Sequence, residues 1–145
     1  MEKLEPITSF KGDYDFLSND FVCPFKYGGL EYSNVEAAFI ASRSSNEGQK
    51  RKISKLSAGN ARKKRNKIEE DPEWYDNRDT ILYDILKAKF EQNEPLKNKL
   101  IKTSTAKLVN TVSYNDIEYG VYMGKGKNKL GKLLMELRKN LLSKE

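Results

Sequence analysis

The sequence contains no histidine, and this absence restricts the possible chemistry more than any residue that is present. Catalytic triads and Cys–His nucleophile pairs need an imidazole, and most zinc sites use one. Cys23 is the single cysteine, so an internal disulfide is impossible. An enzyme built from this chain would therefore move protons with Asp or Glu, or with Tyr and Lys whose pKa values are shifted.

Other absences concern the membrane and cofactors. No hydrophobic run approaches the roughly 20 residues of a membrane span, and MEKLEPITSF at the N-terminus lacks the apolar segment of a signal peptide. The chain also lacks the Gly-rich loops that bind nucleotide phosphates in P-loop and dinucleotide folds. We therefore expect a cytoplasmic protein with no membrane partner, and the sequence indicates no cofactor.

The positive charge is concentrated in one segment. The net charge is +6, yet residues 50–67 contain no Asp or Glu, and the rest of the chain has more acidic than basic residues. The cations of this basic segment are Lys50, Arg51, Lys52, Lys55, Arg62, Lys63, Lys64, Arg65 and Lys67. Such a segment can bind the phosphates of nucleic acid or of a nucleotide, or it can simply be a solvated helix surface.

The 145 residues predict one domain over residues 1–145, mainly α-helical with a small antiparallel β-sheet (an α+β class). We expect a short strand at 7–10 and a hairpin at 21–32 that turns at Gly28–Gly29. Residues 108–114 and 117–123 alternate like two further strands. The expected helices are 34–43, one or two in the basic segment broken near Gly59, 72 or 77 to 92, one from Pro95, and 128–142.

Glu36 is the first candidate functional residue, and two interpretations of it stay open. Ser33 followed by Glu36 fits a capping box, in which the carboxylate reaches back to the helix start. Glu36 also shares a helical stripe with Val35 and Phe39, which would place the carboxylate in an apolar pocket. Burial of that kind would require a cationic or hydrogen-bonding partner.

Three other groups of residues can carry chemistry or be purely structural. Arg78 and Lys89 lie three helical turns apart and could bracket an anion, or their side chains could extend to water. GKGKNKLG at 124–131 precedes the last helix, where Asn128 could cap the helix or contact a ligand. Aromatic and polar residues could stack on a base or form the core: Tyr14, Phe16, Asn19, Trp74, Tyr119 and Tyr122.

The order of six segments resembles the NADAR family, also called the YbiA-like family. These are FKGDYDFLSN, YSNVEAAFIASR, the basic segment, DPEWYDNRD, KFEQNEPLKNKLIKT and GKNKLGKLLMELR. The family fold is a compact, mainly helical domain. Its characterised members are N-glycosidases that cleave phosphoribosylamino intermediates of riboflavin synthesis or remove ADP-ribose from guanine bases. The resemblance implies metal-independent hydrolysis at C1 of a ribose.

The resemblance also assigns residues. Glu36 matches the active-site glutamate of the family, and the other matching positions are Asn19, Trp74, Arg78, Lys89, Phe90, Asp116, Asn128 and Gly131. Three positions depart from the family pattern. Tyr119–Gly120 replaces a Trp–Gly pair, Asn110 replaces a glutamate, and Thr103–Ser104 replaces a Thr–Gly pair. The lost carboxylate at Asn110 bears on substrate identity and on activity.

An oxocarbenium-like transition state needs a nearby carboxylate. We expect Glu36 to activate the water or to stabilise the charge on the ribose, with Asp116 as the second acidic candidate. Arg78, Lys89 and Asn128 would hold phosphate or ribose oxygens, beside Phe90 and Asn19, and Trp74 or Tyr119 would wall the base. The expected partner of this monomer is ADP-ribosylated nucleic acid. The alternatives are a small ribosylated nucleotide, or non-catalytic binding of ADP-ribose or nucleic acid.

Overall fold

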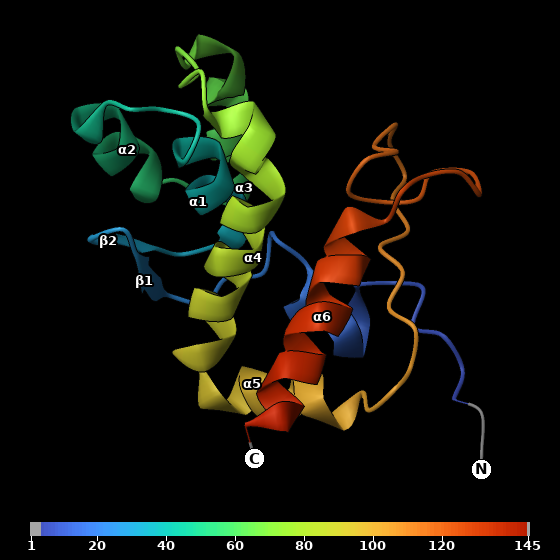
Figure 1. The fold of residues 1–145 in the computed structure, drawn as a ribbon. Coiled ribbons are helices and arrows are strands. Elements are labelled where there is room, and N and C mark those ends of the chain that lie inside the picture. The colour runs from blue at the N-terminus through green and yellow to red at the C-terminus, as the bar shows by residue number, and fades with distance from the viewer. Residues whose placement is uncertain (1–3, 145) are drawn as a thin grey trace. The chain divides into compact units, whose positions relative to one another are not determined.

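The computed structural model describes residues 4–144 and is mainly helical with one small antiparallel sheet, which confirms the predicted fold class (Figure 1). Its elements follow in chain order: η1 (Gly12–Leu17), β1 (Phe25–Tyr27), β2 (Leu30–Tyr32), α1 (Val35–Ala41), α2 (Glu47–Ser54), α3 (Ala58–Lys64), η2 (Arg65–Lys67), α4 (Trp74–Glu91), α5 (Glu94–Lys102) and α6 (Lys129–Ser143). Within residues 4–144, every helix falls short of the length and apolar character of a membrane span.

The chain forms two units, which we call the central and the terminal unit. The central unit is Asn19–Glu94, and the terminal unit comprises the described parts of Met1–Ser18 and Pro95–Glu145. Each unit is described separately below. The single domain expected over residues 1–145 stays a prediction.

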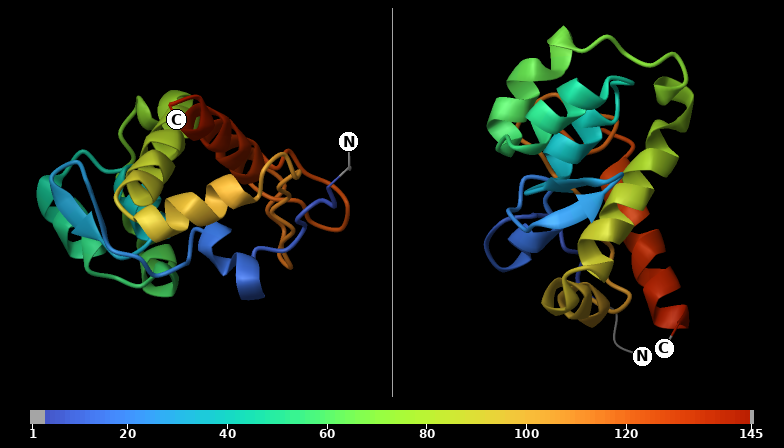
Figure 2. Two further views of the ribbon diagram at one scale, coloured as in Figure 1. Left: turned by 90° about the horizontal axis from the view of Figure 1, so that it is seen from below. Right: turned by 90° about the vertical axis from the view of Figure 1, so that its left-hand side faces the viewer.

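The central unit begins with the predicted hairpin. β1 and β2 pair in antiparallel register, with Phe25 opposite Tyr32 and Tyr27 opposite Leu30. Gly28 and Gly29 both have positive φ, 59° and 83°, as the two central residues of a tight hairpin turn require. The hairpin lies beside α4 (Figure 2).

Polar side chains set the starts of three short helices in this unit. Asn34, Asn46 and Ser57 accept hydrogen bonds from backbone N–H groups at the starts of α1, α2 and α3, respectively. The basic segment therefore contains parts of two α-helices, as predicted, and the break between them lies at residues 55–57, just before Gly59. Gly59 lies in the first turn of α3, because the cap at Ser57 ends the connection from α2 before it.

The long helix α4 supplies the largest part of the core of the central unit. Leu82, Ile85, Leu86 and Phe90 are fully buried along one face, which confirms the predicted helix and its apolar stripe. α1 lies against α2, α3 and α4 (Figure 1), so its residues Ala37, Ala38 and Ala41 are buried. The position of Glu36 is therefore fixed by a helix that is packed on three sides.

The terminal unit contains α5 and α6, both of which were predicted. Leu96 and Leu100 of α5 are buried, as is the stripe of leucines along α6. Arg138 of α6 is also buried and donates a hydrogen bond to Thr103 Oγ1 at 2.9 Å. Ile7 forms one parallel bridge with Leu108, so residues 7–10 contribute a bridge rather than the expected strand.

The two strands expected at 108–114 and 117–123 are wrong. These segments exchange hydrogen bonds, from Val112 N–H to the carbonyl of Val121 and from Val121 N–H to that of Asn110, but they form only isolated bridges. A strand of alternating side chains is stable when it buries one face. Here Tyr114, Ile117 and Met123 are exposed, so the alternation has no apolar surface to bury.

Candidate active site

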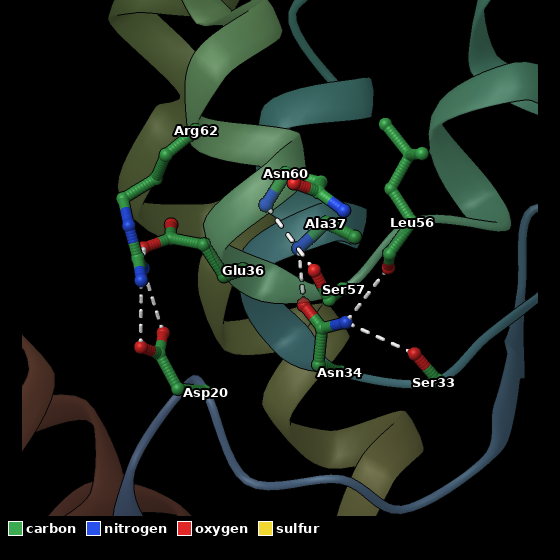
Figure 3. A network of polar contacts seen from close by, with 9 residues as sticks. All are labelled: Asp20, Ser33, Asn34, Glu36, Ala37, Leu56, Ser57, Asn60 and Arg62. Carbon is green, nitrogen blue, oxygen red and sulfur yellow. Dashed lines mark hydrogen bonds and ion pairs between the residues drawn. The ribbon is translucent and has the colours of Figure 1, made fainter.

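Glu36 is the second residue of α1 and is not its cap. Asn34 takes that role, with its Oδ1 accepting from Ala37 N–H at 2.7 Å and its Nδ2 donating to the carbonyl of Leu56 at 3.1 Å (Figure 3). The capping-box interpretation of Ser33 and Glu36 is therefore wrong. The carboxylate of Glu36 is only 20 % exposed and faces a different partner.

That partner is Arg62 of α3. Its Nη1 donates to Glu36 Oε2 at 2.8 Å and to Asp20 Oδ1 at 2.8 Å, and its Nη2 donates to Asp20 Oδ2 at 2.9 Å (Figure 3). Arg62 therefore forms a bidentate salt bridge with Asp20 and a single charged hydrogen bond with Glu36. We call these three residues the carboxylate–arginine cluster. It leaves Glu36 Oε1 without a bond to any described residue.

The cluster sets the charge of Glu36 by opposing effects. Burial raises the pKa of the Glu36 carboxyl, the hydrogen bond and charge of Arg62 lower it, and the charge of Asp20 raises it again. The balance is a raised pKa. The hydrogen bond from Arg62 to Asp20 holds the pKa of the guanidinium above its ordinary value, so Arg62 stays charged and keeps Glu36 ionisable despite its burial.

Asn19 lies directly beside this cluster. Its backbone carbonyl accepts from Glu36 N–H at 3.1 Å. Its side-chain oxygen Oδ1 is buried and has no hydrogen-bond partner in the described part of the chain. Buried polar atoms are nearly always paired, and an atom of this kind can accept a hydrogen bond from a substrate hydroxyl or a water. The structure thus brings together two predicted residues, Asn19 and Glu36.

Trp74 starts α4 and packs against α1. Its Nε1 donates to Ser42 Oγ at 2.8 Å, its ring centroid lies 5.4 Å from that of Phe39, and the Arg43 guanidinium carbon lies 4.6 Å from the indole centroid. Only 5 % of Trp74 is exposed. Most of the indole surface is therefore in contact with protein, and little of it remains as a wall for a base.

The two predicted cations of α4 differ in environment. The Arg78 guanidinium carbon lies 3.7 Å from the centroid of the Tyr75 ring, and Arg78 Nη1 donates to the carbonyl of Tyr75 at 2.6 Å. Lys89 is fully buried, with its Nζ 5.6 Å from the centroid of Phe21 and 5.0 Å from that of Phe90. Lys89 therefore does not extend to water. Phe90 is also fully buried and belongs to the core.

The remaining predicted residues, Asp116, Tyr119 and Asn128, belong to the terminal unit and have backbone partners there. Asp116 Oδ1 accepts from the N–H groups of Glu118 at 3.2 Å and Tyr119 at 3.0 Å. Asn128 Oδ1 accepts from Asn110 N–H and its Nδ2 donates to the carbonyl of Leu108, both at 2.9 Å. Asn128 is thus neither a side-chain cap of α6 nor fully available to a ligand.

One family model, described as the NADAR domain, matches residues 7–142. The chain belongs to the NADAR family. It is 34 % identical over 137 residues to the N-glycosidase YbiA of Escherichia coli strain K12. This match covers 92 % of the present chain and 85 % of the relative. The N-glycosidase YbiA of Shigella boydii serotype 4 gives the same identity and coverage. The NMR structure of E. coli YbiA matches with a TM-score of 0.87 and 31 % identity, covering 99 % of this chain and 89 % of that one.

In this NADAR chain Asn110, for which the family resemblance implied a glutamate, is a scaffold residue. Asn110 N–H donates to Asn128, and Asn110 Nδ2 donates to the carbonyl of Tyr119 at 3.4 Å. The Tyr119 ring, for which the family resemblance implied a tryptophan, has the ammonium of Lys129 5.7 Å from its centroid. Both departures therefore lie in one hydrogen-bonded segment of the terminal unit.

Sequence reasoning missed Asp20 and Arg62 as site residues of this NADAR domain. Arg62 was counted only among the cations of the basic segment, although Ala58, Ala61 and Arg62 share one face of α3 and the two alanines are buried. An arginine on the buried face of a basic helix is the signal that could have identified it. The pairing of Arg62 with Asp20, 42 positions away, has no signal in one sequence.

Proposed function

We propose that this chain hydrolyses the N-glycosidic bond between ADP-ribose and a base of nucleic acid and releases free ADP-ribose. Family membership and the N-glycosidase relatives support the activity class, a hydrolase of N-glycosyl bonds. The observation that carries the site is the Glu36 carboxylate, buried in large part and held by Arg62 through Oε2.

The geometry supports a specific division of work between the two Glu36 oxygens. Oε2 is fixed by Arg62, while Oε1 makes no bond to a described residue and is left for the reaction. As the C1–N bond breaks, positive charge develops on the ribose, and a carboxylate beside it stabilises that charge. The base leaves with the bonding electron pair, Glu36 takes a proton from the water that adds its oxygen to C1, and that proton is then passed to the departed base.

Other residues of the central unit are proposed to orient the ribose. The unpaired Oδ1 of Asn19 accepts a hydrogen bond from a ribose hydroxyl or from the attacking water. Arg78 and Lys89 are the cations proposed to hold the phosphate or ribose oxygens. Asp116, which belongs to the terminal unit, stays the second acidic candidate, with Oδ1 already bound to backbone N–H groups. The reaction is expected to need no metal ion.

The choice of nucleic acid as substrate rests on the basic segment. Arg51, Lys52, Lys55, Lys63, Lys64, Arg65 and Lys67 are exposed on the unit that holds Glu36. A local excess of cations attracts a polyanionic strand by releasing its counterions. A small ribosylated nucleotide, the alternative substrate, has fewer phosphates and gains less from this surface.

Product analysis tests the proposal. The protein is incubated with DNA that carries ADP-ribose on its bases and, separately, with free ribosylated nucleotides, and released ADP-ribose or ribose phosphate is quantified. Release from DNA at a higher kcat/KM than from the nucleotides is the expected result. Release from the nucleotides alone would assign the small substrate, and ADP-ribose binding without release from any substrate would replace the enzyme with a binding module.

A further inference from the structure

A concave site lies in the central unit, apart from the carboxylate–arginine cluster. It is a cavity of about 890 Å³ lined by three lysines of the basic segment, Lys52, Lys64 and Lys67, together with Ile53 and Leu56. Asp20, Glu36 and Arg62 are not among its lining residues. We call it the lysine cavity. Its lysines belong to the basic segment, but the bond-breaking step proposed at Glu36 does not use the cavity.

Helix α3 separates the two sites. Arg62 and Lys64 are two positions apart on this helix, and successive residues of an α-helix are rotated by about 100°. Their side chains therefore leave the helix on nearly opposite sides, about 200° apart. Arg62 is bonded to Glu36 and Asp20, whereas Lys64 lines the lysine cavity. One short helix thus serves two sites.

The charge of the cavity favours an anion. Lys52, Lys64 and Lys67 are exposed, and none of them forms an ion pair with a residue in the range 4–144. Glu69 is the one acidic residue in the lining. Three ammonium groups around one concavity, against one carboxylate, give a positive potential that suits phosphate groups.

Backbone hydrogen bonds connect the segments that form the walls of the cavity. Ser44 forms an antiparallel bridge with Glu70, and Asp71 N–H donates to the carbonyl of Arg43 at 2.7 Å. Asn46 closes the start of α2 by accepting from Gln49 N–H at 2.8 Å. The segment before α2 and the segment after η2 are thereby joined, which fixes the two sides that carry the lysines.

The size and lining indicate more than a single phosphate. Ligand pockets of proteins span roughly 300–1,000 Å³, and about 890 Å³ lies in the upper part of this range. Ile53 and Leu56 add apolar surface beside the ammonium groups. Apolar surface next to cations suits a nucleotide, whose sugar and base can cover the apolar part while its phosphates reach the lysines.

We infer that the lysine cavity binds a nucleotide unit of single-stranded nucleic acid. It thereby anchors the strand while the N-glycosidic bond of an ADP-ribosylated base in that strand is hydrolysed at Glu36. This inference rests on the proposed function for the identity of the strand. The cavity acts on binding and not on chemistry, because its lysines are separate from the carboxylate–arginine cluster.

The test compares two triple variants of equal charge. Lys52→Ala/Lys64→Ala/Lys67→Ala removes the cations of the cavity, and Arg51→Ala/Lys55→Ala/Lys63→Ala removes three exposed cations of the same segment that do not line it. Fluorescence anisotropy with an unmodified single-stranded oligonucleotide gives Kd at several salt concentrations. The cavity variant should lose about tenfold or more in affinity. The slope of log K against log salt should become less steep by about 2, because each of the three lost phosphate contacts contributes roughly 0.7 to it.

The control variant should lose clearly less of both quantities. Equal losses in the two variants would overturn the inference in favour of a diffuse positive field, and so would a wild type that does not bind the oligonucleotide. Competition by a free mononucleotide as strong as that by an oligonucleotide of equal phosphate content would also overturn it, since the ligand would then be a small nucleotide.

Hydrolysis separates this inference from the proposed function. On an ADP-ribosylated oligonucleotide, the cavity variant should have a raised KM and an unchanged kcat. Its hydrolysis of a small ribosylated nucleotide should match that of the wild type. If the wild type releases ADP-ribose and the KM of the cavity variant is unchanged, the cavity inference fails alone. If the wild type releases nothing, the proposed function fails, and anisotropy still decides the cavity.

Discussion

Arg62 donates from a single nitrogen, Nη1, to Glu36 at 2.8 Å while its second nitrogen remains bound to Asp20. The carboxylate of Glu36 is thereby held from one side by a cation that is itself oriented by another carboxylate (Figure 3). Removing Arg62 would leave Glu36 buried without its partner, and this relationship determines the pH dependence expected of the protein.

The first prediction concerns that pH dependence. Glu36 is expected to act as a carboxylate, so activity should fall as the pH drops through its pKa, which burial raises above the ordinary value of 4.5. Arg62 lowers this pKa. In Arg62→Ala the pKa of Glu36 should rise further, and the acid limb of the kcat/KM profile should move to higher pH.

The matched control for Arg62→Ala is Lys63→Ala, which removes one cation from the same helix at an exposed position. Its acid limb should stay in place. Arg62→Lys retains the charge but cannot form the bidentate bond. Its acid limb should lie at a pH between those of wild type and Arg62→Ala. An acid limb in Arg62→Ala that is unchanged or moves to lower pH, in a variant whose thermal unfolding shows it to be folded, would contradict the assignment of Glu36.

The second prediction concerns anion binding by α4. Arg78→Ala should weaken ADP-ribose binding by about tenfold or more, since a charged hydrogen bond contributes roughly 1.5–3 kcal/mol. Lys87→Ala, a change of equal charge on the same helix, should bind as the wild type does. Calorimetric titration with ADP-ribose measures both. Equal affinities of Arg78→Ala and wild type would remove Arg78 from the site.

The third prediction concerns the start of α6. A Cβ on Gly131 would collide with the carbonyl oxygen of Leu108 and would lie 2.5 Å from the Asn128 amide. Gly131→Ala should therefore lower the free energy of unfolding by about 1–3 kcal/mol or more. Gly59→Ala is the control, because nothing lies within 4 Å of its added Cβ and alanine favours a helix by about 1 kcal/mol. Urea denaturation that finds Gly131→Ala as stable as wild type would contradict this packing.

The fourth prediction assigns Asn128 to the scaffold. The residue is 6 % exposed, has a φ of 52°, and bonds the backbone of Leu108 and Asn110. Asn128→Ala should cost about 1–3 kcal/mol of stability, since one buried and one part-buried backbone group lose their partner. ADP-ribose affinity measured below the unfolding transition should change little. A large loss of affinity at unchanged stability would return Asn128 to the binding site.

The sequence indicated those elements whose local signals agree with their tertiary environment. α4 and α6 have long apolar stripes that become the buried faces, and Gly28–Gly29 favours the tight turn that it forms. Residues 108–123 were misjudged because alternation does not tell whether a buried face exists. These segments are joined only by isolated backbone hydrogen bonds, such as that from Val112 N–H to the carbonyl of Val121.

The candidate site was predictable only in part, for a related reason. Glu36 shares its helix face with apolar residues, and this pattern showed that the carboxylate needs a partner. The partner, Arg62, approaches from a helix 26 positions later. Such a pair is set by the packing of α1 against α3, which no local pattern encodes.

The most direct test of the account is the rate of ADP-ribose release by Glu36→Gln, measured beside wild type with a chelator in both samples. Glutamine keeps the shape of the side chain and removes its charge, so turnover should fall by roughly 10²–10³-fold, while folding and ADP-ribose binding persist. Wild-type activity should survive the chelator, because the mechanism uses a carboxylate and not a metal ion. Turnover by Glu36→Gln at the wild-type rate would contradict the central claim and direct attention to Asp116.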